Sequence, residues 1–556
     1  MKYQRFIPYL FLLTATLLIV VSYKDIVHTF YQQDEWLTLG YVRAGAGLGM
    51  LEKATFLDLL GGKYRVLSLP MQIFIYQYIG FNTYAIGIMA LALHLFASFI
   101  LYWVLNMLTE NKIVSFITGL LFVVLSTSIQ SISWYATTFQ TIPSFIFLFL
   151  SLYFTMVYIK VKESRYFWFS FISSVAAFLF KESGGIALLL NPILYILYSK
   201  SRPNIIFLIR KYAIFIGYVA YIGYSRYLSV LVTPQYLGST YLSASSSAYQ
   251  KILINALLYP YLSFSQIFLP QKFVYESAVL FQNVYYQCCT TGSTALSMAQ
   301  NLTSDLLASF FSTGLVLIVG LAYALSKKKA TLQFLILFYI LSYFPFITLE
   351  RGSSYMDSRY MYISSAIGSA LIIYSLSELI SSIRNKIARI SLLGVVSVCI
   401  FSLMLIHIKI DRNIFRVLAY ESQERLLILK QIKLLVPQLP EKPVFYIESN
   451  NKNGYYGVIS QTLPFQQGIG HTLMVWYAED AQTSKPLLAS YFLWGIKDQG
   501  YKEFQNYGFG YYSDIKELQT AVQSNQIQKK QIIGLYYDTD QKKMTNITDT
   551  IIGKLY

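Results

Sequence analysis

Eleven long apolar segments constrain this chain more than any other feature of its sequence. They cover residues 6–23, 84–108, 113–131, 141–159, 166–180, 184–198, 212–230, 305–325, 331–349, 361–380 and 390–408. Most are long enough to cross roughly 30 Å of hydrocarbon as an α-helix, which takes about 20 residues. The chain is 55% hydrophobic and only 13% charged, unlike a soluble protein. The sequence therefore predicts a polytopic α-helical membrane protein with about 11 transmembrane helices.

The basic residues predict how the chain crosses the membrane. If the N-terminus is cytoplasmic, every short cytoplasmic loop is basic, as the positive-inside rule requires. These loops hold Lys112, then Lys160, Lys162 and Arg165, then Lys200, Arg202, Arg210 and Lys211, then Lys327, Lys328 and Lys329, then Arg384, Lys386 and Arg389. We therefore attribute the formal charge of +17 to topology and expect no nucleic acid partner. The expected location is the plasma or inner membrane, multi-pass, with an uncleaved first segment.

Two regions follow from this topology. Residues 1–410 are expected to form the transmembrane domain, with a first external loop at 24–83 and a second large one at 231–304. Residues 411–556 are less hydrophobic and are expected to form a C-terminal extracytoplasmic α/β domain. There, β-like runs at 444–447 and 532–537 alternate with helical patterns at 418–436 and 514–523.

Chemistry is sought where ionisable residues lie against the membrane without a topological reason. The first such place is the acidic pair Asp34-Glu35, which is followed by Trp36 about ten residues beyond the first segment. Paired carboxylates can act as a general base or orient a substrate hydroxyl. Solvated loop charges beside an interfacial tryptophan explain the same residues equally well. The motif alone does not decide between the two.

Three cationic places lie on the same predicted side of the membrane. Tyr64-Arg65 ends the first external loop, Lys181-Glu182 separates two short apolar segments, and Arg359-Tyr360 opens the tenth. Arginine suits phosphate, because its planar guanidinium donates two hydrogen bonds at once. The alternatives are a snorkelling Arg65, an interfacial Lys181–Glu182 ion pair, and an Arg359 that anchors a helix end.

Four further features of the sequence say less about function. Lys63 is read as a surface charge, and the charged residues Glu350, Arg351 and Asp357 precede Arg359. His94 lies inside the second apolar segment, where a helix-packing role is favoured. The adjacent Cys288-Cys289 give no disulfide framework and no metal-ligand spacing.

Taken in order, these segments resemble the GT-C superfamily of membrane glycosyltransferases, which use polyprenyl-phosphate sugars. Its protein O-mannosyltransferase and aminoarabinose transferase branches have an Asp-Glu pair in the first external loop, where Asp34-Glu35 stands here. The run KYRVLSLP at 63–70 is similar to the Tyr-Arg-Pro-Leu stretch of O-mannosyltransferases that carry TPR repeats, and His94 lies near their following histidine. FKESGGIALLLNPILYIL at 180–197 resembles their Lys-Glu segment, and SRYMYISSAIG at 358–368 their Arg-Tyr-x-Tyr segment.

The resemblance covers roughly residues 1–380 and has two departures. Val66 replaces the proline that follows the arginine, and no TPR array follows the last apolar segment. A eukaryote-type mannosyltransferase is therefore not indicated, and the sugar and the acceptor stay open.

The resemblance implies an inverting transfer of a sugar from a polyprenyl-phosphate donor to a hydroxyl of a protein, lipid or glycan at the outer face. Asp34 is then the expected base and Glu35 positions the acceptor or the loop, although the two carboxylates could exchange roles. Arg65, Arg359 and Lys181 are expected to bind the donor phosphate, with Glu182, Tyr64, Tyr360 and His94 in support. No cofactor is expected; a divalent cation can bridge carboxylate and phosphate, but no second acidic cluster is present to hold it.

Two other classes of protein fit the composition. A flippase or transporter for lipid-linked sugars also has many spans and rare charges, but such proteins place their charges near the midplane, often on broken helices. Here the charges lie at external helix ends, which favours chemistry at the outer surface. A membrane scaffold that binds through its tail would leave the acidic pair dispensable.

Overall fold

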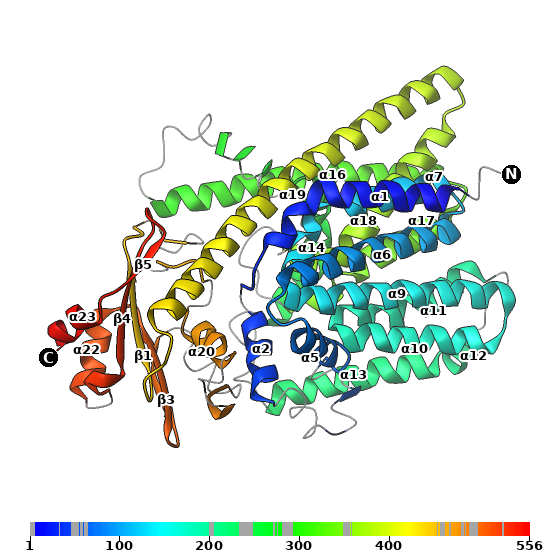
Figure 1. Cartoon of the computed structure of the whole chain (residues 1–556). Helices are drawn as coiled ribbons and strands as arrows, with labels where there is room; N and C mark the ends of the chain where they lie inside the picture. The colour runs from blue at the N-terminus through cyan, green and yellow to red at the C-terminus, as the bar shows by residue number, and fades with distance from the viewer. Residues whose placement is uncertain are drawn as a thin grey trace.

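The computed structural model describes most of the chain. The described residues are 6–32, 34–45, 55, 59–60, 65–199, 205–232, 248–270, 273–274, 276–277, 279–280, 293–348, 356, 358–452, 454–455, 462–465, 469–479, 483, 485–488, 499–524 and 527–555. They form a bundle of roughly parallel helices with a small sheet domain at one end, and the two chain termini lie at opposite ends of the molecule (Figure 1).

Helices account for every one of the eleven predicted apolar segments. The bundle contains α1 (Ile7–Tyr23), α6 (Thr83–Thr109), α7 (Lys112–Val123), α9 (Tyr135–Val161), α10 (Ser164–Phe180), α11 (Ala187–Tyr198), α12 (Ile205–Lys211), α13 (Ala213–Val232), α14 (Ala248–Phe268), α16 (Ser293–Leu325), α17 (Lys329–Leu341), α18 (Tyr362–Ser382) and α19 (Lys386–Leu435). Among them, α14 lies in the second large external loop, where the sequence predicted no span. The chain is a helical membrane protein.

Fewer of these helices are full-length spans than the eleven predicted. In the described part of the chain, seven are long and apolar enough to cross a membrane, or eight if the bent pair that starts with α7 counts as one span. The hairpin helices α10 and α11 have only 17 and 12 residues. At 1.5 Å per residue they reach about 26 and 18 Å, less than the hydrocarbon thickness.

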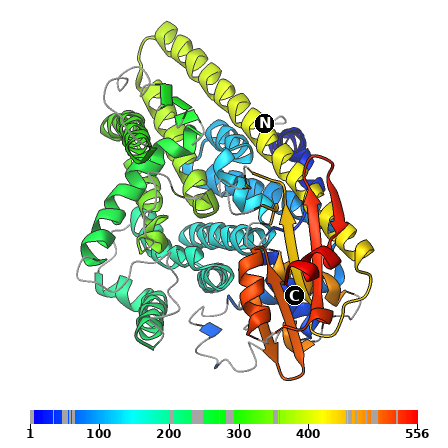
Figure 2. The ribbon, with the colours of Figure 1, turned by 90° about the vertical axis from the view of Figure 1, so that its left-hand side faces the viewer.

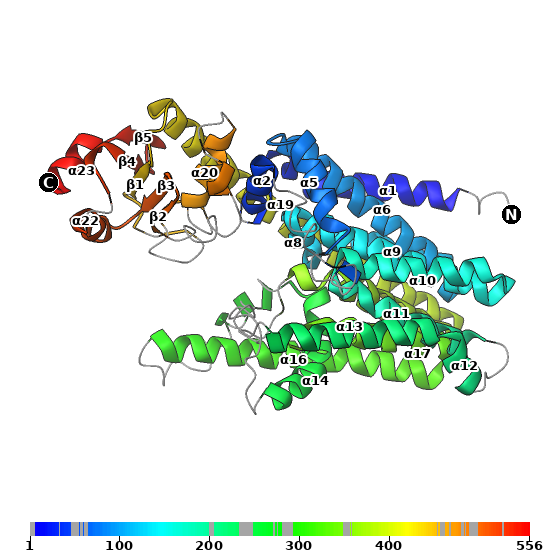
Figure 3. The same cartoon turned by 90° about the horizontal axis from the view of Figure 1, so that it is seen from below.

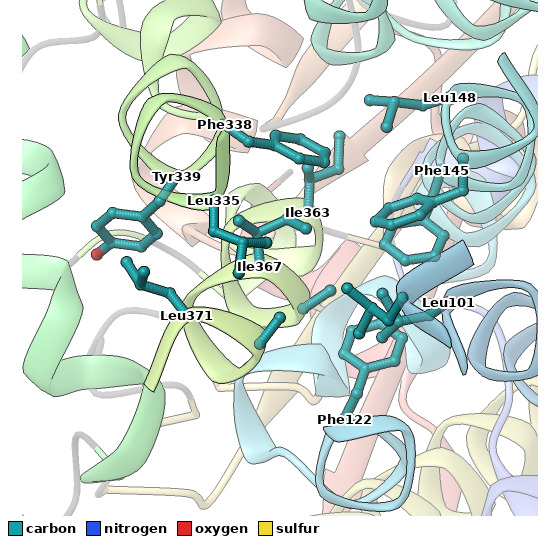
Figure 4. Close-up of a cluster of buried hydrophobic side chains, with 14 of the residues drawn as sticks. Leu101, Phe122, Phe145, Leu148, Leu335, Phe338, Tyr339, Ile363, Ile367 and Leu371 are labelled. Atoms are coloured by element: carbon teal, nitrogen blue, oxygen red, sulfur yellow. The ribbon is translucent and has the colours of Figure 1, made fainter. Parts of the chain in front are cut away.

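The core of the bundle is a layer of close-packed apolar side chains from five helices. Leu101 of α6, Phe122 of α7, Phe145 of α9, Phe338 of α17 and Ile367 of α18 are all buried there (Figure 4). The rings of Phe122 and Phe145 stack with centroids 5.4 Å apart. Since lipid is as apolar as these side chains, the close packing itself holds the helices together.

Helix α19 runs without a break from the bundle into the C-terminal region, residues 411–556, which is called the tail below. It has 50 residues, about 75 Å at 1.5 Å per residue, and runs through residue 410. The helical pattern predicted at 418–436 is the continuation of this helix. Apart from Gly394, the helix contains no helix breaker, and Pro437 follows its end.

The tail forms a five-stranded mixed sheet in the order β2-β3-β1-β4-β5 (Figure 2). Its strands are β1 (Val444–Ser449), β2 (Gly500–Phe504), β3 (Tyr507–Tyr512), β4 (Ile532–Asp538) and β5 (Lys543–Asn546). The central β1 is parallel to β3 and β4, and both edge strands are antiparallel to their neighbours. The described residues of this domain include three α-helices: α20 (Gly470–Ala478), α22 (Ile515–Gln523) and α23 (Thr548–Leu555). The predicted strands at 444–447 and 532–537 and the predicted helix at 514–523 are confirmed.

Candidate functional site

The start of α9 organises the candidate site. The preceding span is broken: α7 ends at Val123, the 3-10 turn η3 (Ser126–Ser128) follows, and α8 (Ile129–Ser133) leads away at 58°. Helix α9 then begins at Tyr135, six residues before the predicted start at 141. Its first two turns carry polar residues that contact elements from four distant parts of the chain.

The acidic pair opens α2 (Asp34–Ala44), a short helix that lies between α20 of the tail and α5 (Ser68–Tyr78) (Figure 3). Glu35 is buried, with 1% of its surface exposed. Its carboxylate accepts hydrogen bonds from the backbone N–H of Gln32 and of Ala136, both at 3.4 Å. The second bond places a negative charge on the N-terminal turn of α9, where the helix dipole favours it.

Asp34 points in a different direction from Glu35. Adjacent residues of an α-helix are about 100° apart around its axis. Glu35 faces the bundle, and Asp34 is only half-buried. Of the two residues, Asp34 is thus the more exposed to solvent.

Aromatic side chains enclose Glu35. The ring centroid of Tyr31 lies 5.7 Å from that of Tyr76, 6.3 Å from that of Tyr135 and 5.8 Å from that of Trp36. Burial raises the pKa of Tyr31 and of Tyr76 well above its usual value, and the nearby Glu35 raises it further. Both tyrosines therefore stay neutral and can donate hydrogen bonds at any physiological pH.

Arg65 contacts α9 one turn beyond the contact of Glu35. Its Nε donates to Oε1 of Glu182 at 3.1 Å, and its Nη1 donates to Gln140. Because Ala136 and Gln140 are four residues apart, the contacts of Glu35 and of Arg65 with α9 are separated by about 6 Å along the helix axis. Arg65 keeps 39% of its side chain exposed.

Lys181 is the most deeply placed cation of the site, with 6% of its surface exposed. It follows α10, and its Nζ donates to Oγ1 of Thr141 at 2.6 Å. Burial, together with the positive charge of Arg65, lowers the pKa of Lys181 to about 7, although Glu182 opposes this effect. The positive charge of Arg359 also lowers this pKa, so the three cations lie within electrostatic range of one another.

A tight 3-10 turn, η4 (Glu182–Ile186), holds Lys181 and Glu182 in place. A Cβ on Gly184 would lie 2.4 Å from the carbonyl oxygen of Ala177 and from Oγ of Ser144. Only glycine therefore lets this turn approach α9 and α10 so closely. The same Ser144 hydroxyl donates to the Ala177 carbonyl at 2.8 Å.

Arg359 completes the group of cations from a third direction. It lies in η7 (Ser358–Tyr360), and its backbone N–H donates to Oε1 of Gln130 at 3.1 Å. Its guanidinium lies 4.9 Å from the ring centroid of Trp134 and 4.8 Å from that of Tyr360. These two cation–π contacts hold the guanidinium beside Trp134, the N-cap residue of α9.

The structure therefore brings together Glu35, Arg65, Lys181, Glu182 and Arg359. Among the predicted supporting residues, Tyr360 joins this group through its contact with Arg359. His94 lies elsewhere, buried between helices, where its ring nitrogens are 2.7 Å from the Tyr362 hydroxyl and 3.1 Å from the Val123 carbonyl. Those contacts fit the packing role favoured from sequence.

Several residues singled out in the sequence lie outside the described residues. These are Lys63, Tyr64, Cys288, Cys289, Glu350, Arg351 and Asp357. Within the described part of the chain, no group of three His, Cys, Asp or Glu side chains is arranged to hold a metal ion.

Sequence reasoning missed the residues of the α9 start that hold the site. Trp134, Gln140 and Thr141 contact three of the predicted cations, and the Ala136 amide contacts Glu35. A signal was present, because Thr137, Thr138, Gln140 and Thr141 place four polar residues ahead of a strongly apolar run.

Comparison with known proteins adds little to this geometry. No protein-family model matches the sequence, and no curated protein matches it. Among solved structures, the chain is similar to the crystal structure of the Archaeoglobus fulgidus oligosaccharyltransferase in the apo form. That alignment covers 93% of this chain and 70% of that chain, with 13% sequence identity and a TM-score of 0.43. This TM-score is too low to assign a function to the chain, so the function is inferred from the site residues.

Proposed function

We propose that this chain is a membrane glycosyltransferase of the GT-C type. It transfers a sugar from a polyprenyl-phosphate donor to an acceptor hydroxyl on the outer face of the membrane, with inversion at the anomeric carbon. The observation that carries the proposal is the convergence of Glu35, one member of the acidic pair, and three cations on the start of α9 and its N-cap residue Trp134.

The cations supply what the leaving phosphate needs. As the bond between the anomeric carbon and the phosphate oxygen breaks, negative charge grows on that oxygen. Arg65, Lys181 and Arg359 approach from three elements, and α9 holds all three side chains through Gln140, Thr141 and Trp134. Cations that are fixed before the reaction stabilise this charge without reorganising, which makes them effective in a partly dehydrated site.

The two carboxylates of the acidic pair have different roles. Glu35 is buried, accepts two backbone hydrogen bonds and lies among tyrosines, so it serves to fix α2 against α9. Asp34 is half-buried and accessible, so it serves as the general base. It takes the proton of the acceptor hydroxyl, the acceptor oxygen forms its bond to the anomeric carbon, and the electron pair of the broken bond leaves on the polyprenyl phosphate.

Binding of an anionic donor is expected to weaken as the pH rises from 6 to 8. Because burial lowers the pKa of Lys181 to about 7, its ammonium is present below this pH and lost above it. Farnesyl methyl phosphate, a phosphodiester with one negative charge throughout this range, should bind up to roughly tenfold more weakly at pH 8 than at pH 6. Isothermal titration calorimetry in detergent micelles measures this difference.

The matched variant for this titration is Lys181→Arg, which stays charged throughout the range. Its affinity for farnesyl methyl phosphate should be nearly constant between pH 6 and pH 8. A wild-type affinity that is equally constant would remove Lys181 from the phosphate site.

The activity itself is tested on cells with and without the chain. We expect mass spectrometry of surface glycans and glycoproteins to show one sugar substituent missing when the chain is absent, and to recover it when the chain is restored. That difference would identify both the sugar and the acceptor. Identical glycans in both strains would favour transport or a scaffold role.

A further inference from the structure

One turn of α19 connects the tail to the segment that carries the acidic pair. Residues 422–425 of this helix lie well beyond the apolar part of α19, close to both the first loop and the sheet domain. Arg425 is fully buried, with 0% of its surface exposed, and its guanidinium donates to oxygens from two separate parts of the chain. Its neighbour Gln423 contacts the first loop, and Glu424 contacts the tail.

The first loop is held by two of its backbone carbonyls. Arg425 Nη2 donates to the carbonyl oxygen of Phe30 at 3.3 Å, and Gln423 Nε2 donates to that of His28 at 2.9 Å. Phe30 lies four residues before Asp34, and its ring packs against Trp36 with centroids 5.7 Å apart. The conformation of residues 28–30 therefore sets where α2 begins.

The tail is held by the same turn of α19. Arg425 Nη1 donates to the carbonyl oxygen of Pro464 at 3.3 Å. The Glu424 carboxylate accepts from the hydroxyls of Tyr455 at 2.7 Å and Tyr537 at 2.9 Å. A single guanidinium thus joins the first loop to the tail, which a flexible ammonium cannot do with the same geometry.

The tail also packs directly on the loop. Trp476 of α20 contacts Phe30 with ring centroids 6.5 Å apart and Phe81 at 5.1 Å. Further along α2, Arg43 forms an ion pair with Glu479 at 2.8 Å. This pair is partly exposed and contributes little on its own, so the buried contacts of Arg425 are the stronger constraint.

We propose that Arg425 is a positioning residue for the acidic pair, through which the tail domain sets the reactive placement of Asp34. This inference rests on the proposed function, because it gives Asp34 its task. Arg65, Lys181 and Arg359 are held by α9 and do not depend on the turn at 422–425. Loss of Arg425 should therefore impair the chemical step and spare donor binding.

The experiment compares Arg425→Gln, Arg425→Lys, Gln423→Ala and Tyr537→Phe in the full-length chain. Gln423 is exposed, so its replacement tests the loop tether without disturbing the buried cluster. Tyr537→Phe is the matched control, because it removes a tail contact to the same turn and leaves both loop carbonyls bound. The first readout is hydrogen exchange of residues 24–32 and of residues 532–538, which needs no substrate.

The second readout is transfer kinetics. The wild-type chain is first tested with undecaprenyl-phosphoryl glucose, galactose, mannose and arabinose. The kcat and the donor KM of every variant are then measured with the donor that the wild-type chain consumes fastest. Arg425→Gln should lower kcat at least tenfold and change the donor KM less than twofold, with faster exchange confined to residues 24–32. Arg425→Lys should recover part of kcat, and Gln423→Ala should lower kcat two- to threefold.

Two results would overturn the inference. The first is equal acceleration of exchange in residues 24–32 and 532–538 of Arg425→Gln with an unchanged kcat per folded molecule. The second, if Arg425→Gln does not fold, is wild-type exchange and kcat in Gln423→Ala. A wild-type rate of transfer by an Asp34→Asn variant would instead show that Asp34 is not the base, and the exchange result would still decide whether Arg425 tethers the loop.

Discussion

Replacing Asp34 with asparagine is expected to lower sugar transfer at least a hundredfold while the amount of folded protein in the membrane stays the same. The amide cannot accept the proton of the acceptor hydroxyl, and a positioned general base commonly contributes two to four orders of magnitude. Asparagine has the same shape as aspartate, and Glu35 makes the buried contacts to Ala136 and Gln32, so we expect the variant to fold. Initial rates of transfer in proteoliposomes measure the effect.

Asp25→Asn is the matched control for this variant. Asp25 lies in η2 (Lys24–His28), part of the same predicted external loop, is also half-buried, and undergoes the same chemical change. Its transfer rate should stay within twofold of wild type. If Asp34→Asn also keeps a wild-type rate, Asp34 is not the base, and Glu35 becomes the carboxylate to replace next.

The second large effect is expected for Arg65→Ala. Removing a charged donor that stabilises a transition state commonly costs two to three orders of magnitude in rate. Here the loss has a further cause: Glu182 loses the guanidinium at 3.1 Å, and its carboxylate then competes with the donor phosphate for Lys181. Transfer should fall about a hundredfold, and binding of farnesyl methyl phosphate should weaken in the same variant.

Arg165→Ala is the corresponding control, because Arg165 also pairs with a glutamate, Glu163, but lies just beyond the opposite end of α9. It should leave both the transfer rate and phosphate binding unchanged. Arg65→Lys separates charge from geometry, since the ammonium keeps the charge and loses the planar fork. Unchanged kinetics in Arg65→Ala would support the alternative that this arginine only snorkels at a helix entrance.

The sequence predicts those features of the fold that depend on neighbouring residues. The apolar segments are local, and all eleven of them are helical. Their lengths are less reliable, because α9 begins at Tyr135 and α19 continues 27 residues beyond the predicted end at 408. In both cases hydropathy falls where the helix leaves the apolar region, but the helix continues, in α9 through Pro143 and in α19 up to Leu435.

The candidate site shows the same division. The residue types and their predicted side of the membrane singled out Glu35, Arg65, Lys181 and Arg359, which the structure brings together on α9. The polar residues at 137–141 gave a signal for the side chains that hold them, but the sequence did not pair these side chains with their partners, because each contact joins segments tens to hundreds of residues apart. Arg425 gave no signal at all, since a charged residue on a long polar helix is normally exposed to solvent.

The different burial of the two carboxylates was also beyond the sequence. Two adjacent acidic residues look equivalent in a loop, and their roles could be exchanged on chemical grounds. Their places on the first turn of α2 separate them physically, because adjacent side chains of a helix are about 100° apart and the Glu35 carboxylate accepts a hydrogen bond from Ala136 of α9. This difference is the basis for choosing Asp34 as the base.

The central claim is tested most directly by donor cleavage in a purified system. Wild-type chain and the Asp34→Asn variant are reconstituted in proteoliposomes with undecaprenyl-phosphoryl glucose, galactose, mannose and arabinose and with a solubilised envelope extract as acceptor source. Mass spectrometry then follows the release of undecaprenyl phosphate together with sugar attached to an acceptor. The account predicts both products from at least one donor with the wild-type chain and neither with Asp34→Asn. Products of equal amount from both proteins, or movement of intact donor across the bilayer without cleavage, would contradict it.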